Sequence, residues 1–180
     1  MDKLKEDQEG EDFGDRTGKD YPGIGVGLIV VNQQRRRGSK LRVLVHKRGQ
    51  QRNDELGLPG VRNEPFCWDF PGGGVEFGEL LEDVCTREIF EEHGLVVDWD
   101  SLEELFSIQH LIYQGTTVVE HWLSHTFITY RFDGEPQIKE PHKCLEWRWV
   151  TLAELEQLSP ITESVRLNLL KLHLTHPDWF

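Results

Sequence analysis

A glycine-rich segment that leads into an acidic helix constrains this 180-residue chain more than any other feature. Between Gly72 and Leu95 the chain reads GGGVEFGELLEDVCTREIFEEHGL. On an α-helix, side chains three or four residues apart share a face, so Glu88, Glu91 and Glu92 project within about 100° of one another. Three like charges this close repel unless something positive lies between them. Oxygen ligands without Cys or His favour a hard cation such as Mg²⁺.

The acidic hexapeptide alone has a second explanation, because runs of charge commonly mark solvated surface. The complete spacing decides against it. Gly73 is followed after five residues by Glu79 and after seven more by Arg87-Glu88-Ile89, then after one residue by Glu91-Glu92 and after one more by Gly94-Leu95. This spacing matches the Nudix box at every defined position. The chain therefore resembles the Nudix hydrolases, which cleave nucleoside diphosphates linked to another group.

The resemblance implies a role for each charged residue of the box. Glu88 and Glu92 would be the main carboxylate ligands of Mg²⁺, with Mn²⁺ as an alternative ion. Glu91 would share a further ion or its waters. Arg87 would pair with the box carboxylates, and Glu79 would coordinate through water or orient its neighbours. The general base varies across the family and stays unassigned.

Further site positions follow from the same resemblance. The main-chain carbonyl of Gly72 would bind metal. The adjacent Gly73 lets the backbone approach substrate phosphate where a Cβ atom would obstruct it. A strand expected at residues 41–46 is followed by Arg48, which would approach the phosphate as the corresponding basic residue does in MutT-like enzymes.

A second segment, residues 140–149, reads EPHKCLEWRW. It resembles the E-P-E-K segment and W-x-W pair of MutT-like proteins that hydrolyse ordinary or oxidised nucleoside triphosphates. His142 and Leu145 replace two expected acids. The distal metal ligand is therefore Glu140, Glu146 or neither.

The expected fold is α+β, an α/β/α sandwich with a mixed central sheet between helices, as the Nudix resemblance implies. In residues 22–31, glycines at positions 23, 25 and 27 alternate with bulky apolar groups, so one face of this strand is bare. That face is the floor of a base pocket, or a surface where a helix packs closely. Further strands are expected at 103–112 and 118–132, joined by a turn at Gln114-Gly115.

Four helix ends are marked by residues with known end preferences. Glu79 is expected in the first turn of the box helix, where a carboxylate complements the dipole, and Gly94 as its left-handed cap. A capping box is expected to start at Thr151, and Thr162 to cap a last helix that ends before Pro177.

On the expected strand 118–132, four side chains fall where the central strands of the family face the substrate: His121, Trp122, His125 and Phe127. Strand histidines are also commonly packed or exposed without a ligand. Cys85 lies among apolar positions of the box helix and is expected in the core.

Residues 1–21 carry eight acidic and four basic side chains with few apolar ones, which predicts a mobile acidic tail before a Nudix domain at 22–180. The polar stretch 49–66 is an insertion, either a lid or a disordered excursion. The three cysteines form no C-x-x-C pair, which predicts reduced thiols, with neither a disulfide frame nor a zinc site. No run is long enough to span a bilayer, so a cytoplasmic protein without a membrane partner is expected.

The net charge of −12 argues against long nucleic acid as a partner and in favour of a small nucleotide whose charge metal ions neutralise. The predicted reaction takes an ordinary or oxidised nucleoside triphosphate to monophosphate and pyrophosphate. ADP-ribose, dinucleoside polyphosphates and capped RNA stay open as substrates. A binding or regulatory module without catalysis is the alternative of another class, and a monomer or homodimer is expected.

Overall fold

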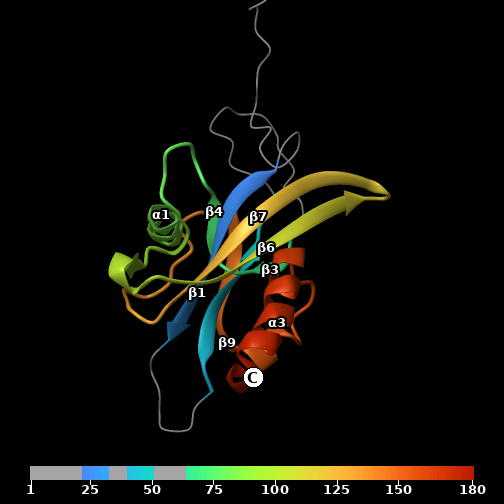
Figure 1. The fold of residues 1–180 in the computed structure, drawn as a ribbon. Coiled ribbons are helices and arrows are strands. Elements are labelled where there is room, and N and C mark those ends of the chain that lie inside the picture. The colour runs from blue at the N-terminus through green and yellow to red at the C-terminus, as the bar shows by residue number, and fades with distance from the viewer. Residues whose placement is uncertain (1–21, 33–39, 51–63) are drawn as a thin grey trace, which may run out of the picture.

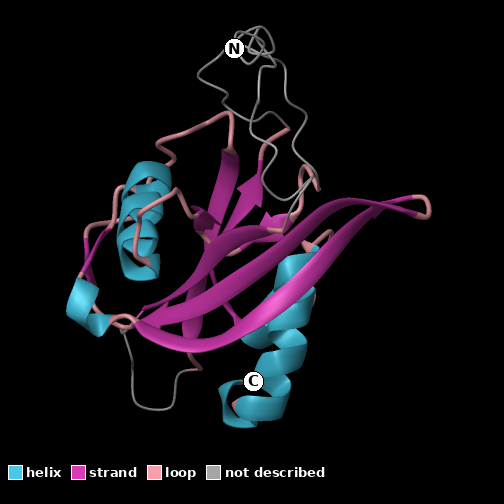
Figure 2. Cartoon of the chain, turned by 45° about the horizontal axis from the view of Figure 1, so that its top comes forward, coloured by secondary structure: helices cyan, strands magenta, loops and turns pink. Residues whose placement is uncertain are grey.

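The computed structural model describes residues 22–32, 40–50 and 64–180. Within these ranges, a mixed seven-stranded sheet lies between helix α1 (Leu81–His93) on one face and helix α3 (Glu163–Thr175) on the other, as Figures 1 and 2 show. The predicted α/β/α sandwich is confirmed. The predicted tail at 1–21 and most of the predicted lid or loop at 49–66 lie outside the described residues.

The central sheet is organised around β1, which pairs in parallel with β7 and antiparallel with β2 and β4. The order of the main path is β3 (Trp68–Asp69), β2 (Arg42–Arg48), β1 (Gly23–Asn32), β7 (Thr117–Thr129), β6 (Glu103–Gln114). Off this path, β4 (Gly72–Gly74) pairs with β1 and β9 (Cys144–Thr151) pairs with β2. The smaller elements are β5 (Val96–Val97), β8 (Phe132–Asp133), α2 (Leu152–Leu155) and 3₁₀ turns at Trp99–Ser101 and Pro177–Trp179.

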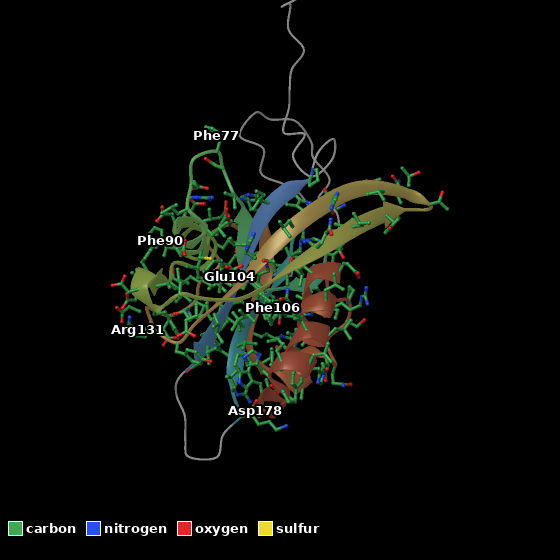
Figure 3. All side chains as sticks on the ribbon, viewed as in Figure 1. Phe77, Phe90, Glu104, Phe106, Arg131 and Asp178 are labelled. Atoms are coloured by element: carbon green, nitrogen blue, oxygen red, sulfur yellow. The ribbon has the colours of Figure 1, made fainter. Side chains whose placement is uncertain are left out.

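Strand alternation in β1 divides the core in two. Towards α1, the strand contributes Val26, Leu28 and Val30, which pack with residues such as Ile89. Towards α3, it contributes Ile29 and Val31, which pack with a group from the last helix: Val165, Leu169 and Leu172. Figure 3 shows Phe106 of β6 on this second side, beside α3.

The long β6–β7 hairpin turns at Gly115, whose φ of 63° is left-handed, so the predicted turn is confirmed. The prediction of a single strand at 118–132 is wrong, because β7 ends at Thr129 and β8 begins at Phe132. The backbone N–H of Arg131 donates to the Thr129 hydroxyl at 3.2 Å, and this local bond diverts the chain after β7 into the separate β8.

Three predicted helix ends are confirmed. Gly94 follows α1 with φ 70°, and its N–H donates to the Phe90 carbonyl. Thr151 forms a reciprocal capping box with Glu154 before α2, and the Thr162 hydroxyl accepts from the backbone N–H of Val165 before α3.

The fourth expectation is wrong, because α1 begins at Leu81 and Glu79 lies in the preceding loop. Gly78 has φ 95° there, and the Glu79 N–H donates to the Glu76 carbonyl in a tight turn. The Glu79 carboxylate accepts from the Glu76 N–H at 2.9 Å, so it organises the loop that enters the helix.

The two leucines near the end of α3 offer a matched stability test. Leu172 is fully buried between α3 and the sheet, whereas Leu174 is 83% exposed. We expect Leu172→Ala to lower the free energy of unfolding by about 2–5 kcal/mol, because it leaves a cavity. Leu174→Ala should change it by less than about 0.5 kcal/mol. Urea denaturation followed by circular dichroism measures both, and equal losses would contradict the assigned helix face.

Candidate active site

The acidic residues of α1 form a gradient from the interior to the surface. The side chain of Glu92 is 2% exposed, that of Glu88 is 12% exposed and that of Glu91 is 48% exposed. The structure thus brings the three box glutamates together on one side of the helix. The carboxylates of Glu92 and Glu88 are therefore largely shielded from water.

The glycines of β4 lie against these carboxylates. The Gly72 N–H donates to Oε2 of Glu92 at 3.2 Å. A Cβ atom at Gly73 would fall 2.2 Å from Oε1 of Glu88, and one at Gly72 would fall 2.1 Å from the Val26 carbonyl oxygen. The segment is glycine because backbone and carboxylate approach more closely than any side chain permits.

Arg87 links the acidic groups to one another. Its guanidinium donates twice to Glu79, at 2.8 and 3.0 Å, once to Glu88 at 2.7 Å and once to Glu91 at 3.4 Å. These bonds to Arg87 lower the pKa of Glu79, while the hydrogen bond to Glu79 is the main cause that raises the pKa of Arg87. The guanidinium therefore stays charged and holds three carboxylates in place.

The electrostatic state of Glu88 fits a cation. Burial raises its pKa above the ordinary value, although the charges of Arg87 and Lys143 work in the opposite direction. The positive side chains therefore compensate this carboxylate only in part. Carboxylate oxygens together with a glycine backbone are the hard donors that Mg²⁺ prefers, so the residues present fit that ion.

The two candidates for a distal acid lie in different places. Glu140 pairs with Lys143 at 2.9 Å, and its Oε2 is buried without a hydrogen-bond partner among the described residues. Because Lys143 also acts on Glu88, Glu140 lies on the same side of the sheet as the box. Glu146 instead pairs with Arg148 and is 42% exposed. The placement favours Glu140.

The other side of β1 carries a second group of polar residues around its bare face. A Cβ atom at Gly27 would meet no described atom within 4 Å, whereas one at Gly25 would lie 3.7 Å from both Trp122 and Ser124. The Trp122 ring also lies 3.9 Å from the Cβ position of Gly74. Open space over Gly27 favours a pocket floor over close helix packing.

Sequence reasoning missed His110 and Asp69 at this second face. His110 is hydrogen-bonded to Ser124 at 3.1 Å, and its Nδ1 is buried without a partner among the described residues. Burial lowers the pKa of His110, which favours the neutral ring. Asp69 accepts from Arg48 at 3.0 Å and from the Thr162 hydroxyl at 3.0 Å. The predicted phosphate ligand Arg48 is thus tied to an acid that the sequence did not single out.

The four side chains predicted to face substrate from β7 lie on two faces. Trp122 shares the glycine face, whereas Phe127 packs in the α1-side core. His125 pairs with Glu104 at 2.6 Å, and His121 is hydrogen-bonded to Gln109. Strand alternation excludes a common face for the four, and strict use of the two-residue period would have separated Trp122 from the rest.

The predicted core role of Cys85 is confirmed, because the residue is fully buried and burial raises the pKa of its thiol. None of Cys67, Cys85 and Cys144 forms a disulfide. Within the described ranges, helices long and apolar enough to cross a membrane are absent.

Fold and site together define a sheet sandwich with a carboxylate-bearing helix held against a glycine strand. Residues 22–170 match the NUDIX domain family, and the chain belongs to that family. The MutT NUDIX hydrolase of Burkholderia pseudomallei superposes with a TM-score of 0.64 and 29% identity, covering 83% of this chain and 97% of that one. The recognition made from the box is confirmed.

Two curated relatives carry names that specify substrates. An RNA pyrophosphohydrolase of Sphingopyxis alaskensis is 36% identical over 107 residues, which cover 51% of this chain and 65% of the relative. An ADP-ribose pyrophosphatase of Methanocaldococcus jannaschii is 32% identical over 99 residues, which cover 54% and 56%. The chain thus spans about half to two thirds of the length of the first curated relatives it matches.

The raised pKa of Glu88 predicts an unusual pH dependence for the metal-free protein. The folded chain binds the carboxyl proton of Glu88 more tightly than the unfolded chain does. Ionisation of Glu88 therefore costs no folding stability below the ordinary pKa of 4.5, and it lowers the free energy of unfolding as the pH rises through the folded pKa. Glu88→Gln should therefore raise the free energy of unfolding at pH 7 by about 0.5–2 kcal/mol and leave it unchanged below pH 4.5.

Urea denaturation in excess chelator at several pH values measures this difference. Glu82→Gln, on the first turn of the same helix, is the control for loss of a carboxylate from α1. If Glu88→Gln lowered the free energy of unfolding at pH 7, the charges of Arg87 and Lys143 would outweigh the cost of burying the Glu88 carboxylate, contrary to this prediction.

Proposed function

We propose that the protein hydrolyses a pyrophosphate bond in a nucleoside diphosphate derivative, with Mg²⁺, or Mn²⁺ in its place, as the required ion. The observation that carries the proposal is the graded carboxylate cluster of α1, held by Arg87 and by the Gly72–Glu92 hydrogen bond against a glycine strand. The family assignment supports the same reaction class.

The proposed metal ligands are Glu88, Glu92, Glu91 and the carbonyl of Gly72, with Glu140 as the distal acid. A bound Mg²⁺ supplies charge neutralisation for the phosphates and lowers the pKa of a coordinated water. Arg87 fixes the carboxylate rotamers, and Glu79 in turn fixes Arg87. The missing side chain at Gly73 leaves room for the Glu88 carboxylate against β4.

Consecutive residues of β4 join the two halves of the proposed site. Gly73 lies against Glu88, whereas Gly74 lies against Trp122 on the opposite side of the strand. Among the described strands β4 pairs with β1 alone, so a nucleotide that crosses the other edge of β4 can place its phosphates beside Glu88 and its base over Gly25 and Gly27. In this arrangement Trp122 supplies an apolar wall, and the buried Nδ1 of His110 is a hydrogen-bonding group for the base.

The preferred substrate is an ordinary or oxidised nucleoside triphosphate, cleaved to monophosphate and pyrophosphate. The similarity to a MutT NUDIX hydrolase supports this choice, and the net charge of −12 disfavours a long RNA. A cytoplasmic location is proposed because three cysteines outside any disulfide suit a reducing compartment.

A product analysis over a nucleotide panel tests the substrate class. The panel contains ordinary and 8-oxo nucleoside triphosphates, ADP-ribose, a dinucleoside polyphosphate, and triphosphorylated and capped RNA, each with Mg²⁺. We expect pyrophosphate release from at least one triphosphate to exceed turnover of every other member. Faster turnover of ADP-ribose or RNA would overturn the choice of a nucleoside triphosphate as the substrate. Binding without turnover of any panel member would indicate a regulatory module.

Glu92→Gln tests the metal-ligand role. The amide retains an acceptor for the Gly72 N–H but removes the negative charge, so we expect kcat to fall by orders of magnitude with little loss of stability. Glu82→Gln should keep wild-type kcat. Near-wild-type turnover of Glu92→Gln at saturating Mg²⁺ would defeat the assignment.

Gly27→Val tests the pocket floor. The new side chain meets no described atom near its Cβ and should leave the midpoint of thermal unfolding almost unchanged. A base in that space would clash, so KM should rise roughly 10–100-fold, equivalent to the 1–3 kcal/mol that overpacking costs. An unchanged KM would show that the substrate base binds elsewhere.

A further inference from the structure

Three buried side chains with metal-binding atoms meet beneath the carboxylate site. His46 comes from the middle of β2, His93 from the last turn of α1 and Cys144 from the start of β9. Their exposed fractions are 1%, 0% and 1%, and one ligand atom from each lies within 4.8 Å of the other two. The fold thus places two imidazoles and a thiol around one point.

The imidazole orientations suit a ligand set. Nδ1 of His93 lies 3.2 Å from the Gln137 carbonyl, which can only accept, so this nitrogen carries the proton. In the neutral ring, Nε2 then directs its lone pair at Nδ1 of His46, 2.9 Å away, so Nδ1 of His46 carries a proton when no metal is bound. To bind a metal through Nδ1, His46 takes its other neutral tautomer, with the proton on Nε2. Metal-bound histidines characteristically donate their other N–H to a carbonyl or carboxylate in this way.

We propose that His46, His93 and Cys144 form a zinc site distinct from the carboxylate site. Zinc prefers nitrogen and thiolate ligands in tetrahedral geometry, with bonds of about 2.0–2.1 Å to nitrogen and 2.3 Å to sulfur. Two nitrogens on such an ion stand about 3.3 Å apart, so the imidazoles need to separate by only a few tenths of an ångström. Mg²⁺ disfavours a thiolate, and the two sites therefore select different ions.

The local charges offset part of the charge of a buried divalent ion. Cys144 contributes one negative charge as a thiolate, and binding releases its proton to solvent. Two neutral imidazoles add none, so Zn²⁺ with these three ligands keeps one positive charge. Oε2 of Glu92 lies 3.7 Å from Nδ1 of His46, so the carboxylate assigned to Mg²⁺ also lies beside this charge.

The position of the cluster gives the ion a structural role. It would tie the end of α1 to two strands of the sheet, one residue away from Glu92 in the chain. The same side-chain positions also fit a metal-free state, in which His46 is hydrogen-bonded to His93 and the Cys144 thiol donates to the Glu146 carbonyl at 3.5 Å. A measurement must distinguish the metal-bound state from this metal-free state.

Cobalt substitution separates them without any use of turnover. The full chain is freed of metal with a chelator and titrated with Co²⁺. We expect tetrahedral visible bands and a thiolate-to-cobalt band in the near ultraviolet that saturate at one ion per chain. Zn²⁺ should abolish these bands, whereas a large excess of Mg²⁺ should not. The protein as purified should also retain zinc by elemental analysis.

Variants assign the ligands. Cys144→Ser should abolish the thiolate band, and His93→Gln should weaken zinc binding by at least the roughly 10–100-fold that loss of an outer-shell partner costs. Cys67→Ser removes another buried thiol and Glu88→Gln alters the carboxylate site, and both should keep the band. Circular dichroism confirms that each variant is folded.

Two results would overturn the proposal: a wild-type chain with no thiolate band after Co²⁺ addition, or a band that survives in Cys144→Ser. Zinc should also raise the midpoint of thermal unfolding of the wild-type chain and not that of Cys144→Ser. Equal shifts in both proteins would place the ion elsewhere.

Discussion

The guanidinium of Arg87 is the interaction on which the acidic end of the molecule depends. Without a positive charge, the carboxylates of Glu79, Glu88 and Glu91 would repel one another across a few ångströms. Arg87 reaches all three, and its bidentate contact with Glu79 fixes the loop before α1 as well as the helix face. Loop, helix and site therefore form one electrostatic unit, although the positive charge compensates Glu88 only in part.

Glycine supplies the complementary constraint. The carboxylates have a defined place because β4 comes so close that a Cβ atom at Gly73 would overlap Glu88. The same strand pairs with Gly25 and Gly27 of β1, which removes side chains from the other side of the sheet. Figure 3 shows Phe77 at the tip of the loop between β4 and α1, where its side chain is exposed. The sheet thus sets how closely the glycines approach the carboxylates.

Features encoded by neighbouring residues were predictable. The box spacing, the caps at Gly94, Thr151 and Thr162 and the burial of Cys85 each depend on residues a turn or two apart, and the structure has them as expected. The helix start at Leu81 was missed because a loop hydrogen bond competes with helical geometry at Glu79.

Features that depend on tertiary pairing were not predictable from local pattern. The contact between His46 and His93 joins residues 47 apart, and no spacing rule for short motifs detects it. The salt bridge between Arg48 and Asp69 likewise requires the β2–β3 register. The placement of the four β7 side chains on two faces follows from alternation, but which face meets the glycines depends on the parallel pairing with β1.

That parallel pairing has a consequence for how such proteins diversify. Positions of β7 that flank the bare glycines, such as Trp122 and Ser124, can be exchanged without touching the apolar layer beneath α1, to which Phe127 belongs. Mutation of these positions can therefore change the proposed base pocket while α1 keeps its packing. One face of β7 supports the box helix, and the other lines the proposed pocket.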